Sequence, residues 1–396
     1  MMGDQDTIST RTQVTYWDLA RACLWLGLTC YGGPAMVGYV REVMVERLRW
    51  LQPKEFAEGL ALSQIVPGAT LTQVITYVGL VLRGPAGAAV AATCFILPGM
   101  LIVLGVSALY FRWQDLPLVL TLSRGIGAVV IALLAYASLR LARSSLPSVG
   151  SYVIAAAACL AYLFRINAFL VVLAAAALAW LFRRGRETAV GPAPAETNIE
   201  RVAPTVWVTL AVIGSLGLLG VWHAAPTLGR LCLAFLGIGS VAFGGGYSMI
   251  PLIQQQVVDK LGVLSVQAFL DGIALGQVTP GPIMLTATFI GYAVTGLLGG
   301  LAATVAIFSP SWVILVAAAP HFHAWSRKAA VQVMIHGIVA SFVGMLVSIL
   351  VRLGGVTLTD VPSVLLAVAA FIAFSLGVDL PIVVVAGMVL SLALFR

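Results

Sequence analysis

Charged residues are scarce in this sequence. Only 9% of its 396 residues are Asp, Glu, Lys or Arg, and 61% are hydrophobic, whereas a soluble domain carries roughly 25% charged residues. A soluble fold is therefore excluded. Most of the long uncharged stretches have the roughly 17–25 residues that a membrane-spanning helix needs, and they cover 85–110, 146–164, 166–182, 206–222, 297–320, 361–377 and 380–395. We expect an all-α polytopic membrane protein.

Motifs for metals, nucleotides and catalysis are also missing. The five cysteines form no C-x-x-C pair, and His321 and His323 have no Cys or carboxylate nearby to complete a metal site. The chain has no G-x-x-x-x-G-K-[ST] run, which an ATP-driven pump would carry. It has neither the H-E-x-x-H nor the G-x-S-x-G run of a candidate intramembrane enzyme. We expect no cofactor, no metal and no enzymatic activity, which leaves a secondary transporter or a channel.

The formal charge of +7 does not indicate nucleic-acid binding. The excess lies in short loops at Arg83, Arg140, Arg143 and the cluster 183–186, as the positive-inside rule expects of cytoplasmic loops. Membrane lipid is a sufficient partner for it. The predicted organisation is an N-terminal tail (1–16), a first repeat (17–182), a cytoplasmic linker (183–205), a linking transmembrane helix (206–222) and a second repeat (227–395).

The two repeats are visible as matched Gly, Pro and Gln residues. Gly27 returns as Gly239 (239 − 27 = 212), Gln64 returns as Gln277 (277 − 64 = 213), and Pro98 returns as Pro310. Matched interruptions in two halves of a membrane protein indicate a transport site between the repeats. Because 206–222 adds one crossing, the second repeat should begin on the opposite side of the membrane. We therefore expect inverted-topology repeats with broken or re-entrant helices.

Four helix breaks are candidate anion sites. A helix N-terminus presents unpaired N–H groups and about half a positive charge, and glycine lets an anion approach closely. Four converging breaks would supply about two charges' worth of dipole, which suits a dianion. The alternative is that Gly and Pro only pack or kink helices. The candidate substrate-binding residues at these breaks are Gly32, Gly33, Pro34, Pro67, Gly68, Gly244, Gly245, Gly246, Pro280 and Gly281.

Polar repeat mates extend the candidate site. Gln64 and Gln277 can donate to an oxyanion without adding charge, or can bond a freed helix carbonyl. Glu58 and Asp271 (271 − 58 = 213) can carry protons or pair with an Arg, or can lie on an exposed helix face. For Glu46 and Asp259 we expect an exposed face. The candidates for coupling or gating are Arg41, Glu42, Glu58, Asp271, Arg124 and His336.

These residues resemble a known family. The sequence is similar to the chromate ion transporter family in its first half at Gly32-Gly33-Pro34, Arg41-Glu42, Trp50-Leu51, Leu60-Ala61-Leu62-Ser63-Gln64 and Pro67-Gly68, and in its second half at Ala242-Phe243-Gly244, Gly276-Gln277-Val278-Thr279-Pro280-Gly281-Pro282 and Gly291-Tyr292. The family usually has Pro-Gly-Pro-Asn where this chain has Pro67-Gly68-Ala69-Thr70, an Arg near Gln254, and Asp where His336 stands.

The resemblance implies a long, two-domain transporter in the prokaryotic inner membrane that exports chromate, with sulfate as a second candidate substrate. Two negative charges leaving down an inside-negative potential release roughly 4.6 kcal/mol per 100 mV. Membrane potential, a proton gradient or both could thus drive export. The alternatives are an anion channel, or a transporter of sulfate or another oxyanion with little chromate preference. The expected partners are a chromate or sulfate dianion and lipid, with a homodimer left open.

Overall fold

The first half of the chain forms a series of helices with short interruptions. The computed structural model describes residues 14–30, 35–182, 202–243, 245–322 and 328–395, and these residues form helices without any strand. The first repeat contains α2 (Tyr16–Thr29), α3 (Ala35–Arg41), the π-helix η1 (Glu42–Arg47), α4 (Pro53–Ile65), α5 (Thr70–Trp113), α6 (Pro117–Ser145), α7 (Val149–Leu163) and α8 (Ala168–Phe182).

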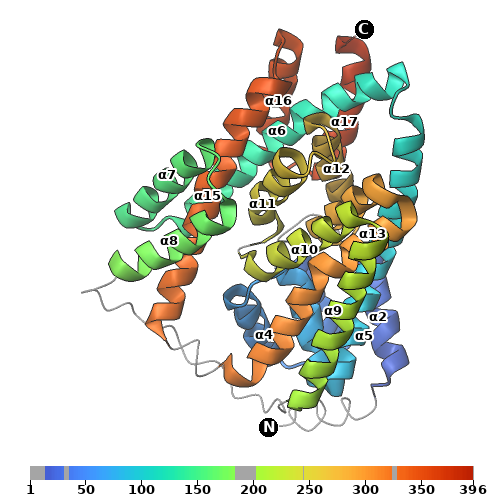
Figure 1. Cartoon of the computed structure of the whole chain (residues 1–396), viewed down its shortest axis with the longest axis vertical. Coiled ribbons are helices and arrows are strands. Elements are labelled where there is room, and N and C mark those ends of the chain that lie inside the picture. The colour runs from blue at the N-terminus through green and yellow to red at the C-terminus, as the bar shows by residue number, and fades with distance from the viewer. Residues whose placement is uncertain (1–13, 31–34, 183–201, 244, 323–327, 396) are drawn as a thin grey trace.

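The second half repeats this order after one extra helix (Figure 1). The extra helix is α9 (Pro204–Ala224), and the second repeat contains α10 (Pro226–Val241), the 3₁₀-helix η2 (Gly246–Met249), α11 (Ile250–Gln254), the π-helix η3 (Gln255–Lys260), α12 (Val266–Val278), η4 (Ile283–Leu285), α13 (Thr286–Ala318), η5 (Ala319–His321), α15 (Ala329–Thr357), α16 (Val361–Ser375) and α17 (Leu380–Leu394). Even the π-helices correspond: η3 starts 213 residues after η1 (255 − 42 = 213). The prediction of an all-α protein built from two homologous repeats is confirmed.

α5 and α13 each contain a sharp reversal. Arg83 and Gly84 leave the helical conformation, and Gly84 has a φ of 65°. A side chain at Gly79 would meet the backbone of Gly87, although eight residues of continuous helix would separate the two by about 12 Å. The chain therefore turns back on itself after a short arm, 70–83. The same reversal occurs at Gly296, where Gly291 meets Gly299.

The short arm of α5 pairs with α4 to form a hairpin. The position of the missing side chain of Gly59 on α4 is filled by the ring of Tyr77, and in the second repeat Gly272 meets Phe289 in the same way. The 13 residues of α4 span about 20 Å, less than the roughly 30 Å hydrocarbon core. Each hairpin thus enters the membrane without crossing it, and its tip lies at 66–69 or 279–282.

The two tips are held by the opposite repeat. Gly68 N–H donates to the carbonyl of Ala242 (2.7 Å), and Gly281 N–H donates to the carbonyl of Cys30 (3.0 Å). Cys30 and Ala242 are themselves repeat mates (242 − 30 = 212). Reciprocal contacts of this kind are the signature of a two-fold relation between two units. Larger elements are exchanged as well, because α15 packs against α7 and α8 while α6 packs against α16 and α17.

Five helices are long and apolar enough to cross a membrane among the residues that the structure describes. The stretches at 146–164, 166–182, 361–377 and 380–395 form helices of only 15 residues each. Capping boxes at Ser148 and Asp360 fix the first residues of α7 and α16 at Val149 and Val361. These four helices are about 22 Å long, so they are shorter than the crossings that the uncharged stretches predicted.

Candidate functional site

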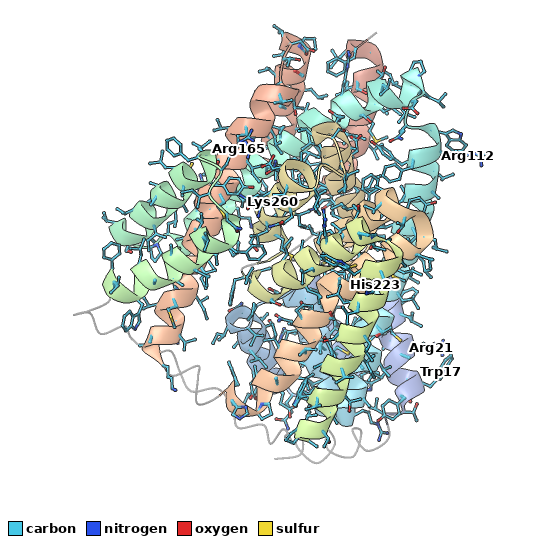
Figure 2. The ribbon with its side chains drawn as sticks, viewed as in Figure 1. Trp17, Arg21, Arg112, Arg165, His223 and Lys260 are labelled. Atoms are coloured by element: carbon cyan, nitrogen blue, oxygen red, sulfur yellow. The ribbon has the colours of Figure 1, made fainter. Side chains whose placement is uncertain are left out.

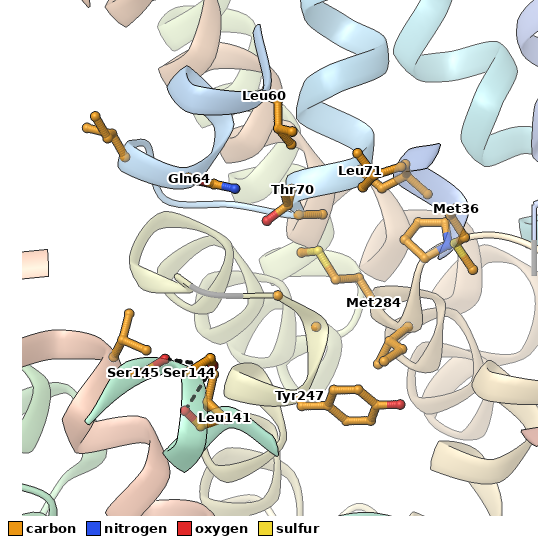
Figure 3. Close-up of a pocket in the computed structure, with 18 of the residues that line it drawn as sticks. Met36, Leu60, Gln64, Thr70, Leu71, Leu141, Ser144, Ser145, Tyr247 and Met284 are labelled. Atoms are coloured by element: carbon orange, nitrogen blue, oxygen red, sulfur yellow. Dashed lines mark hydrogen bonds between the residues drawn. The ribbon is translucent and has the colours of Figure 1, made fainter. Parts of the chain in front are cut away.

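A cavity of about 800 Å³ lies between the two repeats (Figure 3). Its wall includes the residues that follow all four helix breaks, namely Met36 at the start of α3, Thr70 at the start of α5, Gly246 at the start of η2 and Ile283 at the start of η4. The cavity is therefore built mainly from interrupted helices. In a membrane, non-helical backbone is tolerated where protein shields it or where it lines a polar cavity.

The helix starts offer backbone donors, but the glycines themselves are not all free. The N–H groups of Gly68 and Gly281 donate to the opposite repeat, and Ala69 N–H donates to Ser311 Oγ (3.1 Å). The donors that remain are the first N–H groups of the following helices, such as those of Thr70 and Leu71, which have no acceptor within their helix. Because the first residues of these helices line the cavity, the positive ends of the helix dipoles lie at its wall.

Both predicted glutamines line this one cavity. Gln64 ends α4 and Gln277 ends α12, each three residues before the Pro-Gly of its hairpin tip. The Nε2 atom of Gln277 is buried and has no hydrogen bond of good geometry, although the amide lies beside the Tyr247 hydroxyl. A buried donor without an acceptor costs about 1–3 kcal/mol, so it favours a ligand that supplies one. Figure 3 shows Gln64 and Thr70 on one side of the cavity, with Tyr247 and Ser144 across from them.

The electrostatics of the cavity favour an anion. Its lining residues, all of them in the described part of the chain, include no Asp, Glu, Lys or Arg. Tyr247, Ser144, Ser145 and Gln332 add neutral polar groups. His336 also lines the cavity, and its ring Nδ1 lies 2.7 Å from the carbonyl oxygen of Gln332. Attraction thus comes from neutral donors and helix dipoles, without the desolvation cost of a buried cation.

The predicted break residues fall into three groups. Gly245, Gly246 and Gly281 line the cavity, and Gly245 has a φ of 103° that favours glycine. Pro67, Gly68 and Pro280 are absent from the lining. Gly68 and Pro280 lie at contacts between the repeats, since a side chain at Gly68 would meet Ser311 and one at Gly99 would meet the Pro280 carbonyl, while the Pro67 carbonyl accepts from Gln73 Nε2 in its own hairpin. The remaining candidates, Gly32, Gly33, Pro34 and Gly244, lie outside the described residues.

The charged candidates do not line the cavity. Arg41 pairs with Glu46 (3.1 Å) and Glu42 with Arg47 (2.6 Å), all on the exposed surface of α3 and η1. Arg124 is exposed on α6.

Glu58 and Asp271 are buried, so the exposed-face alternative for this pair is wrong. Asp271 accepts hydrogen bonds from Tyr110 Oη (2.7 Å) and Gln267 Nε2 (3.1 Å). Asp259 is exposed, as expected, although its carboxylate binds Arg352 of α15 (3.0 Å).

Several cavity residues carry no strong sequence signal. Ser144 and Ser145 end an apolar helix, and Gln332 begins one, so each resembles an ordinary residue of a helix end. Tyr247 directly follows the glycine run, where an aromatic residue is as consistent with core packing as with a binding site. Thr70 had a signal, since it occupies the position where the resembled family usually has Asn, and it does line the cavity.

Comparison with known proteins decides the family. The chromate transporter family model matches residues 17–180 and again 229–392. The chain belongs to the chromate transporter family. Its oxyanion-transporter relatives include a probable chromate transport protein of Synechococcus elongatus, 30% identical over 92% of this chain and 91% of the relative. A chromate transport protein of Cupriavidus metallidurans is 28% identical over 91% of this chain and 88% of the relative.

An uncharacterized transporter of Methanocaldococcus jannaschii is 30% identical over 98% of this chain and 96% of the relative. No solved structure gives a significant match. Family membership makes this chain a membrane protein of a transporter family whose substrate is an oxyanion. The interpretation of the sequence as a member of this family is confirmed.

Proposed function

We propose that this protein is a secondary transporter that exports chromate, and that the dianion binds in the cavity between the repeats. The observation that carries the proposal is the placement of four helix starts and two glutamine amides around one cavity whose described lining has no acidic side chain. A tetrahedral dianion has acceptor oxygens in several directions. Donors from both repeats can therefore bind it at once.

The binding chemistry follows from the lining. Gln277 Nε2, together with the neighbouring Tyr247 hydroxyl, can donate from the second repeat, and Gln64 and the hydroxyl of Thr70 can donate from the first. Hydrogen bonds to a charged group contribute about 1.5–3 kcal/mol each. None of these donors distinguishes chromate from sulfate by charge, so sulfate is a second substrate in this proposal.

The direction of export rests on the proposed topology. With a cytoplasmic linker, the C-terminal end of α6 and the N-terminal end of α15 both face the cytoplasm, and the cavity is lined by Leu141–Ser145 on the first and by Gln332–Val339 on the second. The cavity then opens inward. Counting crossings back from that linker, one each for α8, α7 and α6, places the turns at Arg165 and Arg112 outside. Both residues are in the upper half of Figure 2, while α9 begins at the bottom of the same view (Figure 1).

The driving force is the membrane potential, a proton gradient or both. An inside-negative potential supplies roughly 4.6 kcal/mol per 100 mV for the exit of two negative charges. Asp271 is the candidate proton carrier because it is a buried carboxyl that bonds Tyr110 and Gln267 away from the cavity.

A vesicle assay tests this function. We expect inverted vesicles that contain the protein to accumulate radiolabelled chromate with saturation, and to exchange it for unlabelled chromate or sulfate. Vesicles without the protein are the control. Flux that never saturates and shows no exchange would indicate a channel instead, and sulfate flux without chromate flux would make this a sulfate transporter. Repeating the assay with and without a proton gradient separates the two driving forces.

A further inference from the structure

The two repeats do not have the same conformation. In the second repeat the segment α11–η3 packs against α8 and α15, and Gln254 and Gln255 are 1% and 4% exposed. In the first repeat no comparable packing joins α3 or η1 to α6 or α17 within the described ranges. The side chains of Arg41 and Glu46 there are 50% and 53% exposed. One broken helix is thus docked on the opposite repeat's side of the site, whereas its mate packs on the core of its own repeat, where Val40 and Met44 are buried, and not on α6 or α17.

An ion pair holds the docked segment to α15. Arg352 Nη2 and Nη1 bind Asp259 Oδ1 (3.0 Å) and Oδ2 (3.1 Å) in a two-pronged contact. Gln254 Nε2 donates to the same carboxylate (3.0 Å). Two-pronged Arg–carboxylate pairs add geometric specificity to their strength, so this contact fixes the position of η3 on α15.

Two amides complete the docking. Tyr162 Oη, on α7, donates to Gln254 Oε1 (2.9 Å) and to the Pro251 carbonyl (2.7 Å). Gln255 Oε1 accepts from Ala168 N–H (2.8 Å), and its Nε2 donates to the Ile166 carbonyl (2.9 Å). Gln255 therefore caps the N-terminus of α8. The docked segment is thus bonded both to the hairpin α7–α8 and to the helix α15.

The repeat mates of these groups are present in the first half but are not joined. Asp259 corresponds to Glu46 (259 − 46 = 213) and Arg352 corresponds to Arg140 (352 − 140 = 212). Glu46 binds Arg41 instead, and no ion pair of Arg140 occurs among the described residues. Gln255 corresponds to Glu42, which binds Arg47. The N-terminus of α17, the mate of α8, has no side-chain cap.

The unpaired arginine lies beside the central cavity. Arg140 and Arg143 line a second cavity of about 600 Å³, which shares Ser144 with the first. Arg140 also lies within electrostatic reach of Tyr247 in the central cavity. The undocked side therefore presents two exposed cations next to the cavity, and this is where an arriving dianion would be attracted.

We propose that Asp259–Arg352 and Glu46–Arg140 are alternating gates, only one of which is closed at a time. The proposal rests on the transport function above and deepens it. In the other state, Glu46 binds Arg140, Glu42 accepts from the N-terminus of α17 at Leu380, and α3–η1 docks on α6. Asp259 and Arg352 then separate, and the cavity opens on the opposite side. An anion bound at Arg140 blocks the ion pair between Glu46 and Arg140. The Glu46–Arg140 gate can therefore close only after the anion has moved from Arg140 into the central cavity.

The chemistry of the two segments explains why the second gate is the closed one here. Docking the second repeat buries two neutral amides, Gln254 and Gln255, whereas docking the first would bury Arg41 and Glu42. Burying charges costs more than burying hydrogen-bonded amides. The conformation with the cavity open on the Arg140 side is therefore favoured when no substrate is bound.

Disulfide trapping tests the alternation. In a chain without its native cysteines, Asp259→Cys with Arg352→Cys and, separately, Glu46→Cys with Arg140→Cys should both cross-link in membranes under mild oxidation. Each cross-link should stop chromate transport, and reduction should restore it. The mismatched pair Glu46→Cys with Arg352→Cys should not cross-link. The second pair reports the state that is not seen in this structure.

The outcomes separate this proposal from the proposed function. Failure of the Glu46–Arg140 pair to cross-link, in protein whose Asp259–Arg352 pair does cross-link, would overturn the alternation even if chromate is carried. Cross-linking of both pairs with no effect of either on transport would overturn it as well. Cross-linking of both in a protein that carries only sulfate would leave the gates intact and change the substrate. As a second measurement, Glu46→Gln should lower the turnover rate without weakening the apparent affinity, because the neutral amide competes less with the anion for Arg140.

Discussion

In the proposed site, Gln64 and Gln277 offer neutral side chains to a doubly charged substrate. They come from equivalent positions of the two repeats and line one cavity. A lysine in their place would cost roughly 2.5–3.5 kcal/mol at mid-membrane and would hold a dianion strongly. An amide avoids that cost. A transporter must also release its substrate, so moderate affinity from neutral donors is an advantage.

Replacing either glutamine should weaken binding. Gln64→Leu or Gln277→Leu removes one hydrogen bond to a charged group, which contributes about 1.5–3 kcal/mol, so the apparent affinity should fall by about ten- to a hundredfold. Gln→Glu at either position should be worse because its charge repels the dianion. Initial rates of radiolabelled chromate uptake over a range of concentrations measure the affinity. If Gln64→Glu transports as well as the parent, the anion does not pass this residue.

Gly245 should be required for its backbone conformation. Its φ is 103°, and nothing lies within 4 Å of the position a side chain would take. Gly245→Val therefore strains the backbone at this φ but causes no steric clash with a neighbour. We expect transport to be lost while the protein remains folded in the membrane. Gly217→Val on α9 is the matched control, because that position is also open but helical. Equal transport by the two variants at matched expression would rule out a conformational role for Gly245.

At the scale of elements, the helix reversals and the hairpin tips determine the shape of the cavity. Each short arm ends at a residue with positive φ, Gly84 or Gly296, and each reversal is packed glycine against glycine. The short arms can then pair with α4 and α12 and bring Gln64 and Gln277 to the same depth. The cavity therefore depends on backbone contacts in which no side chain fits.

Gly79→Leu should prevent this packing. A side chain there would meet the carbonyl oxygen of Gly87 and the methyl group of Ala91, so the short arm of α5 could not fold back. We expect a strong loss of monodisperse protein in detergent, measured by size-exclusion chromatography of a fluorescent fusion. Gly105→Leu, on the long arm of the same helix, is the control because nothing lies within 4 Å of it. Normal yields for Gly79→Leu would contradict the reversal.

The repeat and its helix breaks could be predicted from the sequence, because Gly, Pro and Gln recur at a nearly constant offset. The reversals could not, since Gly84 alone indicates either a kink or a turn. Arg49 and Arg165 have positive φ angles that their residue type does not predict, whereas their repeat mates, Gly262 and Gly377, are glycines, which favour positive φ. The contact of Gly68 with Ala242 depends on packing between distant segments. Which of the two segments, α3–η1 or α11–η3, is docked depends on a small difference in conformational free energy. A pattern of residue types does not reveal such a difference.

For the whole molecule, the orientation of the repeats is the main untested prediction. The linker 183–205 is predicted to be cytoplasmic, and α9 should place the start of the second repeat outside. In a chain without native cysteines, Glu196→Cys should react with an impermeant thiol reagent only from the inside, and His223→Cys only from the outside. Labelling intact cells and inverted vesicles measures both. Reaction of both positions from the same side would contradict the inverted arrangement.

The exchange of helices between repeats has a consequence for biosynthesis. The hairpin α7–α8 packs on α15, which is translated much later, and the tip of the first hairpin needs the carbonyl of Ala242. Until the second half is synthesised, the surfaces of the first half that normally contact it remain exposed in the membrane. Exposed interior surfaces of this kind make misassembly more frequent. Cutting the gene within the linker should give two fragments that are each degraded when made alone. Synthesised together, they should associate and restore transport.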